Sequence, residues 1–106
     1  MPRKPKEISI EQHFVDEMKK AFPTAQVHKY EIRRSEPDRI CLLPGGRCVF
    51  VELKRPGEDL REEQVRAAKR LHALGFECYK VSSKNEVDGL IEFMKTEAFV
   101  PMITGE

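Results

Sequence analysis

Apolar residues recur at helical spacing near the start of the chain. Ile10, Phe14 and Met18 follow one another every four residues, and Pro23 stops the pattern. Ser9 stands just before them, with Gln12 three residues later, which is the spacing of a capping box. We therefore expect a first helix over about residues 10–22.

The next segment contains residues that are typical of strands. Residues 25–34 mix β-favouring side chains with charges, which favours a strand. Two apolar runs follow, Arg39–Leu43 and Arg47–Leu53, with Pro-Gly-Gly between them. This loop chemistry predicts a β-hairpin with a three-residue loop. Counting outward from Leu43 and Arg47 sets Ile40 opposite Phe50, and Asp38 opposite Glu52.

Helical spacing returns in the second half of the chain. Asp59 and Glu62 have the spacing of a second capping box, which predicts a helix over residues 60–74 that ends at Gly75. Its apolar face is expected to hold Ala68, Leu71 and Leu74, with Gln64 upstream on the same side. A strand over 76–82 and a helix over 85–95 follow, and 99–103 is either a short edge strand or irregular. The order of elements predicts an α/β fold in which helices flank a central mixed sheet.

Length and composition limit the possibilities. A chain of 106 residues has room for one core, so we expect a flexible basic arm over residues 1–7 and a single domain over 8–106. Lys and Arg number 19 against 18 Asp and Glu, so any basic surface must be local. No apolar run is long enough for a membrane span or a signal region, which favours a cytoplasmic protein. The three cysteines lack CxxC spacing, and we expect reduced thiols.

The candidate chemistry lies in the predicted hairpin. The register brings Asp38 and Glu52 face to face, with Cβ atoms roughly 4.5 to 5.5 Å apart. Two carboxylates at that range repel each other unless a cation lies between them, and Mg²⁺ prefers such oxygen ligands. Lys54 shares the face of Glu52 and adds a positive charge for a phosphate or an attacking hydroxide. A solvated polar stripe is the alternative, but these charges lie within a run apolar enough for a central strand.

These residues also carry a family resemblance. Pro37-Asp38 followed by Glu52-Leu53-Lys54 resembles the signature of the PD-(D/E)xK nucleases. The wider match is similar to the virus-type replication-repair nuclease (VRR-NUC) domain, over the segments Pro-Asp-Arg-Ile, Leu-Pro-Gly-Gly-Arg, Phe-Val-Glu-Leu-Lys-Arg-Pro-Gly, Gln64 and Leu-Gly-Phe-Glu-Cys-Tyr. The resemblance covers about residues 7–91 and implies a restriction-endonuclease-like core.

The resemblance implies a Mg²⁺- or Mn²⁺-dependent DNA endonuclease. Asp38, Glu52 and the backbone carbonyl of Leu53 would hold the metal, and Lys54 would orient the attacking water. Glu11 would hold a second metal or a metal-bound water, and Gln64 would position Lys54 or the phosphate. Small stand-alone members act as homodimers on branched DNA such as Holliday junctions, and a phage origin is implied. No nucleotide cofactor and no membrane are expected.

DNA contacts must come from local clusters of cations because the net charge is small. The candidates flank the motif or lie on the basic arm: Lys4, Lys6, Arg33, Arg34 and Arg55. Two other functions stay open from the residues alone. One is a catalytically silent DNA-binding or assembly module of the same fold, and the other is a nuclease without branch preference. The dimer interface is also open, with the first and last helices as candidates.

Overall fold

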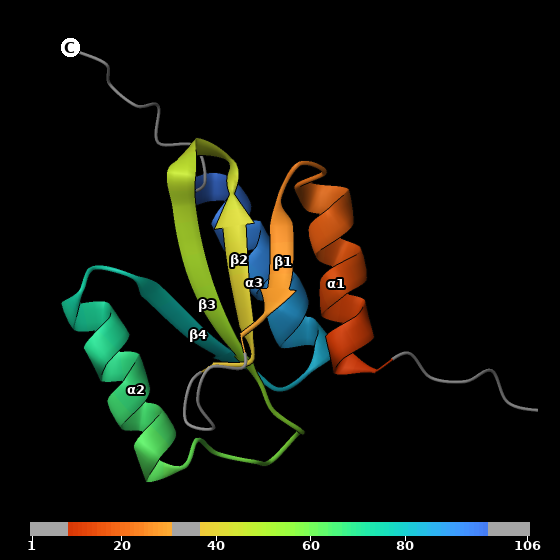
Figure 1. Cartoon of the computed structure of the whole chain (residues 1–106). Coiled ribbons are helices and arrows are strands. Elements are labelled where there is room, and N and C mark those ends of the chain that lie inside the picture. Colours follow the sequence, from red (N-terminus) through yellow and green to blue (C-terminus); the bar gives the residue numbers. More distant parts are fainter. Residues whose placement is uncertain (1–8, 31–36, 98–106) are drawn as a thin grey trace, which may run out of the picture.

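A computed structural model of the chain describes residues 9–30 and 37–97. The predicted basic arm, part of the segment predicted as a strand over 25–34, and the tail 99–103 lie outside these residues. The predicted order of helix, three strands, helix, strand and helix is confirmed (Figure 1). The elements are α1 (Ile10–Ala21), β1 (Gln26–Lys29), β2 (Arg39–Leu43), β3 (Arg47–Leu53), α2 (Glu62–Ala73), β4 (Glu77–Val81) and α3 (Lys84–Glu97).

The four strands form one mixed sheet in the order β1-β2-β3-β4. β1 pairs with β2 and β2 with β3 in antiparallel fashion, whereas β4 runs parallel to β3 after the crossover through α2. The hairpin register is the predicted one, since Leu43 pairs with Arg47 and Ile40 with Phe50. Gly45 and Gly46 turn the loop with φ of 84° and 79°, values that glycine adopts without strain.

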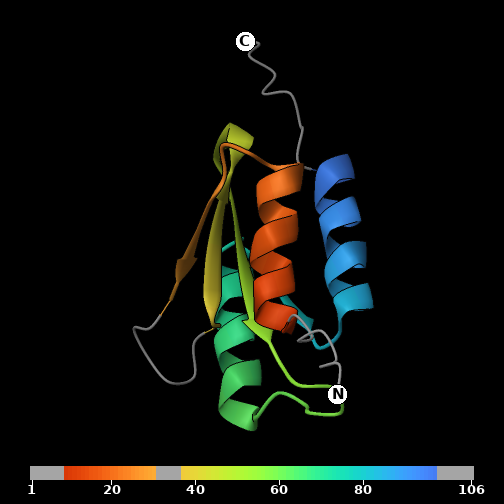
Figure 2. The same ribbon diagram turned by 90° about the vertical axis from the view of Figure 1, so that its right-hand side faces the viewer.

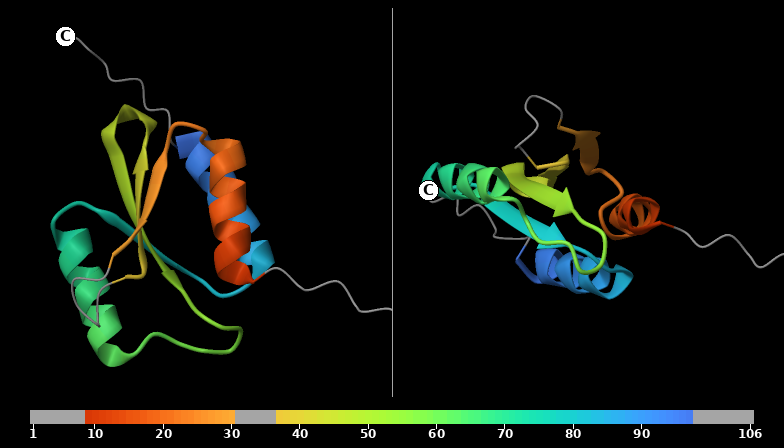
Figure 3. Two further views of the ribbon diagram at one scale, coloured as in Figure 1. Left: turned by 45° about the vertical axis from the view of Figure 1, so that its right-hand side comes forward. Right: turned by 90° about the horizontal axis from the view of Figure 1, so that it is seen from below.

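Two helices cover one face of the sheet. α1 and α3 lie side by side on that face (Figure 2), and β-strand alternation turns Val49 and Val51 toward them. Phe14 of α1 and Met94 of α3 complete a core in which all four side chains are fully buried. α2 packs instead beside β4 (Figure 3). In the described part of the chain, no helix is long and apolar enough to cross a membrane.

The helix ends test the predicted caps. The backbone N–H of Gln12 donates to Ser9 Oγ at 3.1 Å, which confirms the first cap. The second is wrong: α2 begins at Glu62, two residues later than expected, and the backbone N–H of Arg61 donates to Gln64 Oε1 at 2.8 Å. Gln64 thus performs the capping that the spacing assigned to the residues before it. Gly75 ends the helix as predicted, with φ of 93°.

The predicted apolar face of α2 is also partly wrong. Leu74 is 74% exposed, whereas the buried side chains of the helix are Gln64, Ala67 and Leu71. The regular helix ends at Ala73, so Leu74 lies in the cap and leaves the buried stripe. The cysteines are free thiols as expected, and burial raises the pKa of Cys41 to about 12.

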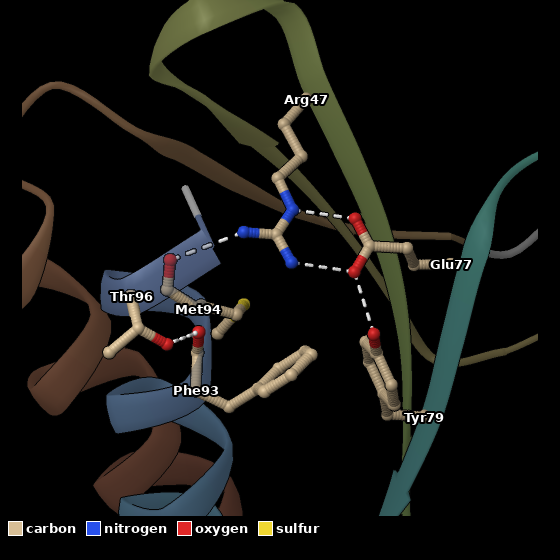
Figure 4. Close-up of polar contacts among 6 residues, drawn as sticks. All are labelled: Arg47, Glu77, Tyr79, Phe93, Met94 and Thr96. Atoms are coloured by element: carbon tan, nitrogen blue, oxygen red, sulfur yellow. Dashed lines mark hydrogen bonds and ion pairs between the residues drawn. The ribbon is translucent and has the colours of Figure 1, made fainter. Parts of the chain in front are cut away.

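An ion pair fastens the end of the sheet that carries the hairpin loop (Figure 4). Arg47, the first residue of β3, donates from Nε and Nη2 to the two carboxylate oxygens of Glu77 on β4, at 2.5 and 2.6 Å. Its Nη1 donates to the backbone carbonyl of Met94 in α3 at 3.2 Å, and the Tyr79 hydroxyl donates to Glu77 at 2.6 Å. The network therefore ties β3, β4 and the last helix together.

Candidate active site

A hollow of about 560 Å³ lies at the end of the sheet opposite the hairpin loop. Here β3 ends, β2 begins, and the first turn of α1 approaches from the covered face (Figures 1 and 3). The charged side chains that line the hollow are Glu11, Lys29, Asp38, Arg39, Lys54 and Arg55. Four separate segments of the sequence thus contribute charges to one cavity.

Asp38 is held at the mouth of the β2–β3 hairpin. The last pair of the ladder is Arg39 with Val51, so the same register continues to Asp38 and Glu52. The backbone N–H of Leu53 donates to Asp38 Oδ2 at 2.9 Å. This bond fixes the carboxylate of Asp38 beside the backbone of the Glu-Leu-Lys motif.

Glu52 is a buried carboxylate with an unusual environment. Its side chain faces away from the Val51 side of the sheet and is only 6% exposed. Burial first, and the nearby charge of Asp38 second, raise its pKa to about 7, against smaller opposing effects of Lys54, of a backbone hydrogen bond from Asp38 and of Arg61. The charges of Asp38 and Lys54 both act on Glu52, so these three side chains belong to one site.

Gln64 contacts Glu52 rather than Lys54. Its Nε2 donates to Glu52 Oε2 at 3.0 Å, while its Oε1 accepts the N–H of Arg61 at the start of α2. The amide is thereby fixed at both ends, and Glu52 is oriented by the helix cap. Together with Pro37 and Lys80, Glu52 and Gln64 line a separate hollow of about 40 Å³. Asp38, Leu53 and Lys54 therefore face the open cavity, and Glu52 stands behind it.

Glu11 lies in the first turn of α1, where the resemblance placed it, and forms an ion pair with Arg39. Arg39 was not singled out from the sequence. It is 6% exposed, its Nη1 donates to the backbone carbonyl of Asp38 at 3.3 Å, and burial lowers its pKa. A sequence signal existed, because alternation places Arg39 on the same strand face as Cys41 and Leu43, and a cation there needs a partner.

The candidate DNA contacts are placed only in part. Arg55 is exposed and lines the hollow, and Lys29, which sequence reasoning missed, lines it from the end of β1. The N–H of Lys54 donates to the carbonyl of Val81 at 2.9 Å, which continues the parallel pairing beyond β3. Lys4, Lys6, Arg33 and Arg34 lie outside the described residues.

The residues present fit a hard divalent cation. Asp38, Glu52 and the Leu53 carbonyl offer only oxygen ligands, and a cation between the carboxylates would remove the repulsion that raises the pKa of Glu52. Among the described residues, no three His, Cys, Asp or Glu side chains cluster closely enough to hold a metal by themselves. The remaining positions would fall to water and a substrate phosphate, as is usual for Mg²⁺.

A mixed α/β sheet with an acidic pair and a lysine at the ends of two adjacent strands defines the PD-(D/E)xK class of nuclease folds. No family model matches the sequence. The chain is 40% identical over 80 residues to "Putative nuclease p44" of Acyrthosiphon pisum secondary endosymbiont phage 1, covering 76% of this chain and 86% of that protein. Its fold is similar to a solved VRR-NUC domain, with a TM-score of 0.70 and 29% identity over 78% of this chain and 90% of that one. The chain belongs to the VRR-NUC family of nucleases.

Proposed function

We propose that this nuclease is a Mg²⁺- or Mn²⁺-dependent DNA endonuclease whose site is built from Asp38, Glu52, Leu53 and Lys54. The observation that carries the proposal is the pairing of Asp38 with buried Glu52 beside Lys54, at the edge of an open cavity. An acidic pair in which one carboxylate is buried is costly unless a cation joins it. Asp38, Glu52 and the Leu53 carbonyl would hold the metal, which lowers the pKa of bound water and neutralises charge on the phosphate.

Three further side chains, Lys54, Gln64 and Glu11, would act beside the metal ligands. Lys54 lines the cavity and would orient the attacking water and stabilise charge developing on the phosphate. Gln64 would keep Glu52 in one orientation through its amide bond. Glu11 could reach a second metal or a metal-bound water only by leaving Arg39, with which it is paired.

The cations of the cavity support a nucleic-acid substrate. Lys29, Arg39, Lys54 and Arg55 outnumber the two acids that line the same hollow, Glu11 and Asp38. We assign phosphate contacts to Arg55 and Lys29, with Lys4, Lys6, Arg33 and Arg34 as further candidates from the sequence. Contacts of this kind supply affinity and salt dependence but no base specificity.

We further propose that branched DNA, such as a Holliday junction, is the preferred substrate and that the protein acts as a homodimer. A four-way junction has two-fold symmetric strands to cut, and one chain carries one site, so a two-fold dimer would supply the second. Because the relative is a phage protein, we place the activity in the cytoplasm of a bacterial host.

The test is incubation of purified protein with labelled four-way junction, flap and linear duplex DNA, with and without Mg²⁺ or Mn²⁺. We expect cleavage of the junction only with metal, and loss of cleavage in Asp38→Asn. Asp59→Asn is the matched control, since Asp59 has the same chemistry but an exposed side chain near the start of α2. Sedimentation of the same samples would report the dimer.

Three outcomes would contradict parts of the proposal. Binding without cleavage in either metal would indicate a DNA-binding module. Equal cleavage of all three substrates would remove the branch preference. A monomer that resolves junctions symmetrically would remove the dimer.

A further inference from the structure

Arg39 is a buried cation at the edge of the cavity. Strand alternation turns it to the side of the sheet that carries the core residues Cys41 and Leu43, and its side chain is only 8% exposed. A guanidinium in such a place needs a negative partner at all times, because an unpaired buried charge is strongly destabilising. Glu11 of α1 supplies that partner.

The two members of this ion pair are unequal. Glu11 is 51% exposed, so its carboxylate can turn into water at little cost, whereas Arg39 cannot leave its position without uncovering the core. Arg39 is also held by the backbone carbonyl of Asp38 at 3.3 Å. Glu11 is therefore the partner that can be exchanged, and Arg39 is the fixed member.

The pair lies where a substrate phosphate would enter. Arg39 and Glu11 line the same hollow as Asp38 and Lys54, and Asp38 directly precedes Arg39 in the chain. A phosphate presents two oxygens to a guanidinium much as a carboxylate does, and such paired charge-assisted hydrogen bonds are strong. An anion that replaces Glu11 would leave Arg39 paired in both states.

We propose that Arg39 is a phosphate-binding residue of this site and that Glu11 occupies it in the free protein, so that a DNA phosphate displaces Glu11. The proposal rests on the proposed function, since it takes the DNA backbone as the anion. It gives Glu11 the role of a competitor of the substrate rather than of a metal ligand.

DNA binding measured by fluorescence anisotropy tests this exchange. The experiment uses a labelled four-way junction, Ca²⁺ as the cation, and Lys54→Ala as the common background so that the DNA stays intact. We expect Glu11→Gln to tighten binding roughly two- to fivefold, because it removes a half-exposed carboxylate that competes with the phosphate for Arg39. We expect Arg39→Gln to weaken binding about tenfold and to reduce the salt slope by about 0.9, the loss of one phosphate contact.

The matched control is the exposed ion pair of Glu62 and Arg66 on α2, at 3.0 Å. Glu62→Gln and Arg66→Gln change the net charge by the same amounts, and both should alter affinity less than the corresponding changes at Glu11 and Arg39. The decisive comparison is the double variant. When Arg39 is already Gln, Glu11→Gln should tighten binding no more than Glu62→Gln does.

Two results would overturn the exchange. In the first, Glu11→Gln leaves affinity unchanged or weakens it, as a lost metal ligand would. In the second, Glu11→Gln still tightens binding fully when Arg39 is Gln. If Arg39→Gln fails to fold by circular dichroism, Arg39→Lys replaces it, and a lower affinity at an unchanged salt slope is then expected. Failure of the parent protein to bind any DNA would refute the proposed function itself. If the protein binds and cleaves DNA but the effect of Glu11→Gln does not depend on Arg39, only the exchange is refuted.

Discussion

The pKa values of two glutamates on the β3–β4 pair are shifted in opposite directions. Glu77, near the hairpin end, receives two hydrogen bonds from Arg47 and one from Tyr79, and these hydrogen bonds lower its pKa. Glu52, at the other end, is buried beside Asp38, and its pKa is raised to about 7. Both carboxylates are hydrogen-bonded, but hydrogen bonds from a guanidinium dominate the pKa of Glu77, whereas burial and the like charge of Asp38 dominate the pKa of Glu52.

The difference separates a structural ion pair from the candidate metal site. At Glu77 the protein supplies the whole positive charge itself, and the network ties the last helix to the sheet (Figure 4). At Glu52 the protein supplies an amide from Gln64 and the charges of Lys54 and Arg61, but these do not offset burial and the charge of Asp38. A carboxylate pair that its own protein does not neutralise is thus a sign of a ligand.

The largest effect that would test this contrast is on catalysis. We expect Lys54→Ala to lower kcat roughly a thousandfold, because it removes a charge that stabilises the developing anion. The thermal midpoint should stay within about 4 °C, since the side chain of Lys54 lies outside the core and its loss is expected to cost about 0.5 kcal/mol. The rate of cleavage of junction DNA in Mg²⁺ measures the change in kcat, with Lys69→Ala on the exposed face of α2 as the control. Unchanged turnover would exclude Lys54 from the site.

At the hairpin end, the effect should fall on stability instead. Arg47→Met leaves the Glu77 carboxylate without its partner and is expected to lower the free energy of unfolding by about 2 kcal/mol, below the usual cost of a fully buried pair because Glu77 is partly exposed. Urea unfolding measures the loss, and Arg66→Met on α2 should cost less than about 0.5 kcal/mol. If Arg47→Met kept full stability but lost cleavage, Arg47 would have a role in activity rather than in stability, contrary to the contrast drawn between the two ends of the sheet.

The pH dependence of stability should carry the signature of Glu52. The folded-state pKa of about 7 lies above the ordinary value of 4.5, so the native state holds the extra proton between them. Its contribution therefore weakens stability as pH rises from about 4.5 to about 7. In EDTA at pH 8 we expect Glu52→Gln to be more stable than the parent protein by roughly 2 kcal/mol. Urea unfolding across this range measures it.

Metal provides the matching control for Glu52. Mg²⁺ or Mn²⁺ at pH 8 should raise the thermal midpoint of the parent protein, because a ligand that binds only the native state stabilises it. The midpoint of Glu52→Gln should rise less. Identical pH profiles for the two proteins in EDTA would show that Glu52 is not held protonated near neutrality.

The smallest expected effect concerns the third member of the Glu77 network. Tyr79→Phe keeps the ring packed edge-on to Phe93, with centroids 5.9 Å apart, but removes the hydroxyl that donates to Glu77. The expected loss is about 1 kcal/mol in urea unfolding, the usual worth of one such bond. An unchanged free energy of unfolding would show that Arg47 satisfies Glu77 alone.

Local chemistry made much of the fold predictable. Ser9 caps α1, Gly75 ends α2, and Pro44-Gly45-Gly46 sets the hairpin register, and each depends on neighbours in sequence. The errors arose where packing chose between local options. Gln64, rather than Asp59, caps α2 because its amide is also engaged by Glu52, which is twelve residues away.

The sequence by itself determined the hairpin register, and with it the approach of Asp38 to Glu52, because pairing across a short loop is a matter of counting. Only the tertiary structure decided that Glu11 meets Arg39 and that Gln64 meets Glu52, since these contacts join elements whose relative positions depend on the whole core. It also decided how the glutamates ionise. The pKa of a carboxylate is set by burial and by the charges that folding brings near it, and neither is a property of the local sequence.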